Sequence, residues 1–134
     1  MKLNAFLIIN AIIAAVFGLG FVFVPGQVLS LYDIAGGDQI ELIGQLFGAS
    51  LVAFAVVTWS VRNAPDSEAR RAILLALLVG DAVGFIVALI GQLGGVVNAV
   101  GWSTVVIYLV LAIGFAYFLF AGGAAPAKEH GPAM

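Results

Sequence analysis

Four long apolar stretches, separated by short polar or glycine-rich breaks, constrain this chain more than any other feature. Each reaches the roughly 20 residues that a helix needs to cross about 30 Å of hydrocarbon. Backbone polar groups find no water in lipid, so such stretches are expected to be helices, and no strict alternation of polar and apolar residues favours a membrane β-barrel. The predicted spans are Leu3–Val24, Leu42–Val61, Ala72–Leu93 and Val100–Phe120.

The composition agrees with burial in a bilayer. Of the 134 residues, 63% are hydrophobic and 9% are charged, whereas a soluble domain carries about a quarter charged residues. We therefore expect an all-α fold, an integral membrane four-helix bundle of up-down-up-down topology, as one domain over residues 1–121. Residues 122–134 are predicted to form a flexible cytoplasmic tail. The net charge of −2 without a basic patch argues against nucleic acid as a partner.

The basic residues predict the orientation of the spans. If the N-terminus is cytoplasmic, every lysine and arginine lies on the cytoplasmic side, as the positive-inside rule requires. The chain is thus expected to be a multi-pass protein of the cell inner membrane, N-in/C-in, with the lipid bilayer as its surroundings. The basic residues are Lys2, Arg62, Arg70, Arg71 and Lys128, and the acidic residues of the first loop, on the other side, are Asp33, Asp38 and Glu41.

The breaks between the spans carry helix-capping and turn signals. Asp66 or Ser67 is placed to cap the third helix. Pro25 ends the first span, and apolar residues follow at helical spacing within 28–32. That segment fits either a short amphipathic turn in the membrane interface or an ordinary loop.

Asp81 is the most informative residue, because it lies near the middle of the third span. An aspartate at that depth costs about 3 kcal/mol on insertion scales, which the thirteen Leu, Ile, Val and Phe residues of the span offset at about 0.3–0.6 kcal/mol each. Glycines share its helix face, so its carboxyl group is expected to point into the bundle. The polar residues expected within its reach are Asn10, Ser50 and Tyr108.

Two interpretations of Asp81 are open. In the first, the carboxyl group is protonated and stabilises the bundle through hydrogen bonds across helices. In the second, Asp81 is a proton or cation relay, or it anchors the polar group of a ligand. The sequence holds no basic residue inside the spans to pair with it, which favours the structural interpretation.

Small residues at four-residue spacing predict close helix packing. Such residues lie on the first, second and third spans, and together they favour a compact bundle, with homo-oligomerisation as the rival use of one stripe. The glycines concerned are Gly18, Gly44, Gly48, Gly84 and Gly91.

No catalytic, cofactor-binding or metal-binding constellation is recognisable in the sequence. The single histidine, His130, lies in the predicted tail, and cysteine is absent, which removes thiolate ligands and nucleophiles. No HExxH, phosphate loop or nucleophile elbow occurs. We therefore expect neither an enzyme nor a bound cofactor.

Two stretches carry a resemblance: GQLFGASLVAFAVVTWSVRNAPDSEARRAILLALLVGDAVGFIVALIGQ and GVVNAVGWSTVVIYLVLAIGFAYFLF. Over most of its length the chain resembles small bacterial membrane proteins of unknown function with four predicted spans. The resemblance implies the topology and assigns no functional residue.

Two functional hypotheses follow. The first is a non-enzymatic membrane protein that acts as an accessory subunit or binds a lipid or small apolar ligand. The second is a small oligomeric transporter or channel subunit with Asp81 as its protonatable site. Both allow a homo-oligomer or a larger membrane complex. A membrane enzyme would need catalytic groups from a partner chain.

Overall fold

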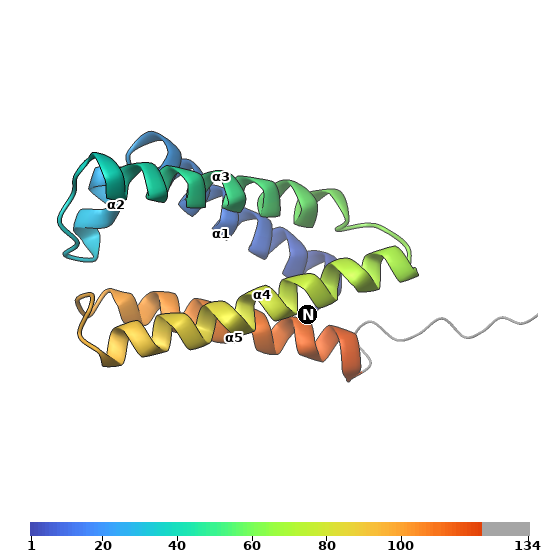
Figure 1. The fold of residues 1–134 in the computed structure, drawn as a ribbon. Coiled ribbons are helices and arrows are strands. Elements are labelled where there is room, and N and C mark those ends of the chain that lie inside the picture. Colours follow the sequence, from blue (N-terminus) through green and yellow to red (C-terminus); the bar gives the residue numbers. More distant parts are fainter. Residues whose placement is uncertain (122–134) are drawn as a thin grey trace, which may run out of the picture.

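The computed structural model describes residues 1–121, which are helical apart from short connections (Figure 1). Four helices are long and apolar enough to cross a membrane, so the chain is an all-α, multi-pass membrane protein. The predicted tail, with Lys128 and His130, lies outside the described residues. The helices are α1 (Leu3–Phe23), α2 (Pro25–Leu31), α3 (Asp38–Ser60), α4 (Glu68–Leu93) and α5 (Gly101–Phe120).

Two long helices begin earlier than the apolar stretches predicted, because their first turns carry polar residues. Helix α4 begins at Glu68, where the Ser67 hydroxyl accepts a hydrogen bond from the Arg70 backbone N–H at 3.1 Å. This is one of the two predicted caps. Helix α3 begins at Asp38, after Gly37 at a φ of 149°, which favours glycine.

The segment that begins at Pro25 is the short helix α2, which is longer than the predicted turn and is not an ordinary loop. Proline occupies its first turn, where a missing N–H costs nothing. Pro25 and Leu29 are buried, whereas Gln27 and Ser30 are exposed. Helix α2 is therefore amphipathic and packs its apolar side against α1 and α3.

The long helices form two antiparallel pairs, α1 with α3 and α4 with α5 (Figure 1). In the first pair, α1 and α3 cross closely where two glycines face each other. A Cβ atom on Gly48 would lie 2.7 Å from the Gly18 carbonyl oxygen, and one on Gly18 would lie 3.0 Å from the Gly48 oxygen. Only glycine lets the two backbones approach this far.

The other glycines of the predicted stripes differ from one another. A side chain at Gly84 would overlap the Tyr108 ring of α5, so Gly84 allows α4 and α5 to pack closely in the second pair. A Cβ atom on Gly44 would lie 3.2 Å from the Phe21 ring. Gly91 was expected to pack against a helix, and this is wrong: no atom lies within 4 Å of a Cβ placed there.

The two pairs meet at the end of the molecule that carries the N-terminus, which we call the basic end because Lys2, Arg62 and Arg70 lie there. Phe6 of α1 stacks edge-on against Phe115 of α5, with ring centroids 4.9 Å apart. This contact belongs to a buried cluster that ties α1, α4 and α5 together: Phe6, Leu7, Leu74, Leu77, Leu111, Phe115, Phe118 and Leu119.

At the opposite end, which we call the α2 end, polar contacts join the pairs. The hydroxyl groups of Tyr32 and Thr104 lie 2.7 Å apart in a hydrogen bond. The Asn98 side chain donates to the Leu31 carbonyl oxygen at 3.0 Å, and its backbone N–H donates to the Tyr32 carbonyl oxygen at 3.2 Å. Between the two ends, no Cα atom of α3 comes within 8 Å of one in α4.

Candidate functional site

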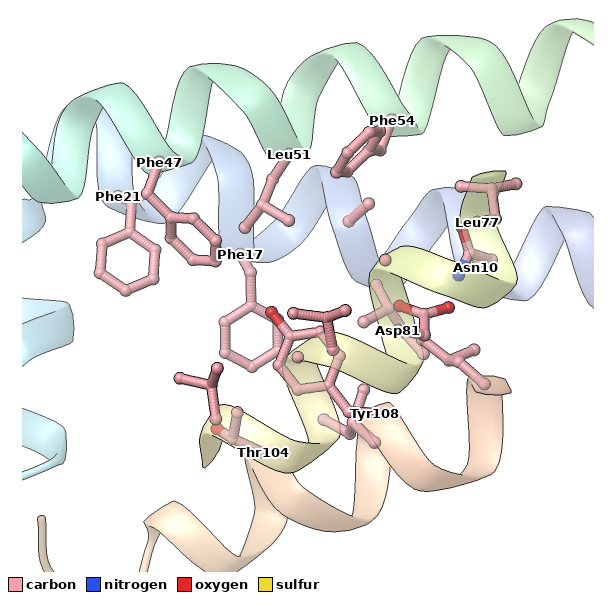
Figure 2. A pocket seen from close by; sticks show the side chains of 18 of the residues that line it. Asn10, Phe17, Phe21, Phe47, Leu51, Phe54, Leu77, Asp81, Thr104 and Tyr108 are labelled. Atoms are coloured by element: carbon pink, nitrogen blue, oxygen red, sulfur yellow. The ribbon is translucent and has the colours of Figure 1, made fainter. Parts of the chain in front are cut away.

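A cavity of about 530 Å³ lies between the two helix pairs (Figure 2), and its lining extends from Leu77 and Leu111 toward the basic end to Tyr32 and Thr104 at the α2 end. Its size falls within the range of about 300–1,000 Å³ that is usual for small-molecule sites. All four long helices line it, and α2 and the loop after it contribute Leu29, Tyr32 and Ile34. It lies at the depth of the hydrocarbon, because the helices that line it are the membrane spans.

Aromatic and aliphatic side chains form most of the cavity wall. Phe21 of α1 and Phe47 of α3 stack edge-on with ring centroids 5.4 Å apart. Phe17 and Phe54 line the wall beside them, and Figure 2 shows these rings projecting from α1 and α3 toward α4. No lysine, arginine or histidine within residues 1–121 lines the cavity.

Asp81 projects into this cavity from the middle of α4, facing Asn10 of α1, which belongs to the other helix pair (Figure 2). Asn10 is 5% exposed, so its amide group is shielded from the surroundings of the bundle. The sequence therefore predicted the inward direction of Asp81, and the glycine on its face, Gly84, is covered by Tyr108.

The Oδ2 atom of Asp81 is buried and has no hydrogen-bond partner. A buried polar atom without a partner costs about 1–3 kcal/mol. The structural interpretation required hydrogen bonds from this carboxyl group to other helices, and none joins it to Asn10, Ser50 or Tyr108 within residues 1–121. Within residues 1–121, this oxygen therefore makes no hydrogen bond that joins the helix pairs.

Ser50 was expected near Asp81, and this expectation is wrong. Its hydroxyl group donates to the Leu46 carbonyl oxygen of its own helix at 3.3 Å, and its side chain is exposed. The face of α3 that lines the cavity carries Phe47, Leu51 and Phe54 at helical spacing. Ser50 is three residues from Phe47 and four from Phe54 on α3, yet it is not among the residues that line the cavity.

Tyr108 lines the same cavity as Asp81, and two further polar residues, Tyr32 and Thr104, line it at the α2 end. The apolar spacing within 28–32 includes Tyr32, and no pattern in the sequence singled out Thr104. Their hydrogen bond links residues 72 positions apart, so no spacing pattern could reveal it. The cavity thus has one polar region around Asp81 and Asn10 and a second at Tyr32 and Thr104.

No three histidine, cysteine, aspartate or glutamate side chains within residues 1–121 come together as a metal site. Comparison with known protein families, curated proteins and solved structures finds no match to this chain. The cavity and its residues are therefore the basis on which function is proposed.

Proposed function

We propose that this protein binds a lipid or another small apolar molecule in the cavity between its two helix pairs, without chemical conversion. The observation that carries the proposal is the cavity of about 530 Å³ at membrane depth, walled mainly by apolar side chains. An apolar cavity in contact with a bilayer has acyl chains as its nearest source of an occupant. The proposal extends to an accessory role, in which the bound molecule or the protein itself serves a larger membrane complex.

The polar residues of the cavity support a ligand with one polar group. Asp81 and Asn10 face each other across it, and the Asp81 Oδ2 atom lacks a partner. Small-molecule sites usually combine an apolar wall with a few such polar groups, which fix the orientation of the ligand. A ligand that hydrogen-bonds this oxygen would remove the cost of leaving it buried and unpaired.

The proposal places the protein in the cell inner membrane with both termini in the cytoplasm. Lys2, Arg62 and Arg70 lie at one end of the helices, whereas Asp38 and Glu41 lie at the other. This separation agrees with the positive-inside rule. Labelling of single cysteines introduced at Lys2 and Gln39 with a membrane-impermeant maleimide in whole cells tests it: only the second should react.

Native mass spectrometry of the protein purified in a mild detergent tests ligand binding. The expected spectrum contains the chain with one bound small molecule, released as an apolar or lipid-like species on activation. A chain that carries nothing and takes up no added lipid contradicts the proposal.

A matched pair of variants on α3 ties the bound molecule to the cavity. Leu51→Trp places a larger side chain in the cavity, where Leu51 projects (Figure 2). Leu46→Trp makes the same change on the same helix at a position 62% exposed and outside the cavity. We expect Leu51→Trp to lose the bound molecule and Leu46→Trp to keep it. Equal retention in both variants would place the ligand elsewhere.

A second candidate function is transport, in which Asp81 takes up and releases a proton or cation. The unpartnered Oδ2 atom of Asp81 supports it, because a relay must exchange partners. The contacts at both ends would have to open in turn. Purified protein in liposomes should then show a pH-dependent flux that Asp81→Asn abolishes while the fold is retained. Absence of flux, or equal flux in the variant, rejects this candidate.

A further inference from the structure

The exposed residues of the cavity wall all lie on two of the four spans. On α1 and α5, every lining residue is buried or half-buried, including Asn10, Phe17 and Tyr108. On α3 and α4, most lining residues are exposed. We call these six residues the portal: Phe47 and Phe54 of α3, and Ala76, Gly80, Val83 and Val87 of α4.

The portal opens sideways, at the depth of the hydrocarbon. Helices α3 and α4 are consecutive spans, yet no Cα atom of one comes within 8 Å of the other. A contact between the helix pairs lies at each end of the cavity: Phe6 packs against Phe115 at the basic end, and Tyr32 is hydrogen-bonded to Thr104 at the α2 end. A molecule dissolved in the bilayer reaches the portal without crossing either contact.

The side chains of the portal agree with such a path. None of the six is polar or charged, so passage of an acyl chain requires no polar group to be desolvated. Phe47 and Phe54 are 42% and 48% exposed. Across from them, Gly80 leaves the α4 side of the portal open, because no atom lies within 4 Å of a Cβ placed there.

The chemistry inside the portal selects the polar group of the ligand. Asp81 presents a buried carboxyl oxygen without a partner, and no lysine, arginine or histidine among residues 1–121 lines the cavity. A carboxylate or phosphate head beside Asp81 in its ionised form would bring like charges together with no cation to offset them. A hydroxyl or ammonium head donates a hydrogen bond to the oxygen, and charge-assisted hydrogen bonds are the stronger kind.

We infer that the ligand is a single-chain amphiphile with a hydrogen-bond-donating head, which enters from the bilayer through the portal between α3 and α4 and places its head at Asp81. This inference rests on the proposed binding function and adds the path and the ligand class. The apolar chain lies along the phenylalanine wall toward the α2 end.

The head-group part is tested with three probes that share a twelve-carbon chain: dodecan-1-ol, dodecylamine and dodecanoate at neutral pH. Binding to the full chain is measured by native mass spectrometry. The alcohol and the amine should bind about tenfold or more tightly than the carboxylate, since one charged hydrogen bond is worth about 1.5–3 kcal/mol. The preference should be lost in Asp81→Leu. Equal or tighter binding of dodecanoate overturns this part, and the ratio of alcohol to amine distinguishes the two head groups.

The path is tested by the rate at which bound dodecan-1-ol is replaced by its deuterated form. Gly80→Leu adds a side chain to the portal where nothing opposes it, and Gly91→Leu adds the same side chain to the same helix, also unopposed but outside the cavity. We expect exchange to slow about tenfold or more in Gly80→Leu only. An unchanged rate in Gly80→Leu, or equal slowing in both variants, overturns the portal.

A cross-link provides a second measurement that does not depend on the glycine variants. The chain has no cysteine, so Phe47→Cys with Val83→Cys introduces the only two thiols. A flexible bismaleimide joins them across the portal, and the same protein before cross-linking is the control. Exchange should slow only after cross-linking. If the wild-type protein binds none of the probes, the proposed binding function is wrong. If it binds them, but Gly80→Leu and the cross-link leave the exchange rate unchanged, only the proposed entry path is wrong.

Discussion

The contacts within the helix pairs and the contacts between them use different chemistry. Within the first pair, the backbones of α1 and α3 touch at Gly18 and Gly48, and within the second, Tyr108 covers Gly84. Between the pairs, large apolar side chains meet at the basic end and hydroxyl groups meet at the α2 end. The middle of that interface is a cavity.

This difference follows from what drives association in lipid. Acyl chains are as apolar as leucine, so helices gain from van der Waals contact and hydrogen bonds rather than from leaving water. Close contact needs small residues on both helices, and α1 and α3 supply a glycine each. Helices α3 and α4 do not meet, and their facing sides carry Phe47 and Phe54 against Ala76 and Gly80. Close backbone and ring contacts stabilise each pair, whereas the cavity between the pairs has room for a ligand.

Removal of the aromatic contact between the pairs should have the largest effect. Phe115→Ala deletes a fully buried ring that stacks on Phe6. We expect a loss of about 3–5 kcal/mol in the free energy of unfolding, measured by titration with sodium dodecyl sulfate and circular dichroism. Phe120→Ala is the control on the same helix, because Phe120 is 71% exposed. A similar loss in both variants would show that the basic end does not join the pairs.

Crowding of the glycine crossing within the first pair should have the next largest effect. Gly48→Ala puts a methyl group 2.7 Å from the Gly18 carbonyl oxygen and 2.8 Å from the Phe21 Cβ atom. Overpacking of this kind costs about 1–3 kcal/mol. Gly91→Ala, where the methyl group meets nothing, should cost nothing or add up to about 1 kcal/mol through helix propensity. The same denaturant titration measures both, and equal stabilities would contradict a close crossing.

Loss of the hydroxyl contact at the α2 end should have a smaller effect. Tyr32→Phe and Thr104→Val each remove one side of the 2.7 Å hydrogen bond. Hydrogen bonds between membrane helices are worth about 0.6 kcal/mol on average, so each variant should lose roughly that amount. A double-mutant cycle checks the pair: the double variant should cost no more than the larger single change. Full additivity would mean that the two groups do not interact.

Replacement of Asp81 should cause the smallest loss of stability. Because its Oδ2 atom has no partner, Asp81→Leu breaks no hydrogen bond between the pairs. The free energy of unfolding should fall by no more than about 0.5 kcal/mol, or rise. If the carboxyl group instead held helices together, the loss would be about 1–2 kcal/mol. Thermal unfolding of the two proteins in the same detergent, without added ligand, separates these outcomes.

The accuracy of the sequence-based predictions depended on whether a feature is local. Ser67 caps α4 through a hydrogen bond to a residue three positions away, so the pattern of residues predicted it. The direction of Asp81 also follows from the helix face on which Gly84 lies. The expectation for Ser50 was wrong because comparable depth in the membrane does not bring two side chains together when their helices, α3 and α4, do not pack against each other. The expectation for Gly91 was wrong for a similar reason: a small residue allows another helix to pack closely, but it does not determine that a helix lies there.

The sequence by itself determined the all-α fold, the four spans and the separation of charge between their ends, because lipid leaves an apolar stretch of about 20 residues no alternative to a helix. The tertiary structure decided how the spans pair and where they part. It placed Asp81 opposite Asn10 in a cavity and put the exposed part of the cavity wall on α3 and α4. Helix pairing depends on side chains far apart in the chain, such as Tyr32 with Thr104 and Phe6 with Phe115. No local pattern encodes those contacts, since in lipid every apolar face is equally free to meet another helix or an acyl chain.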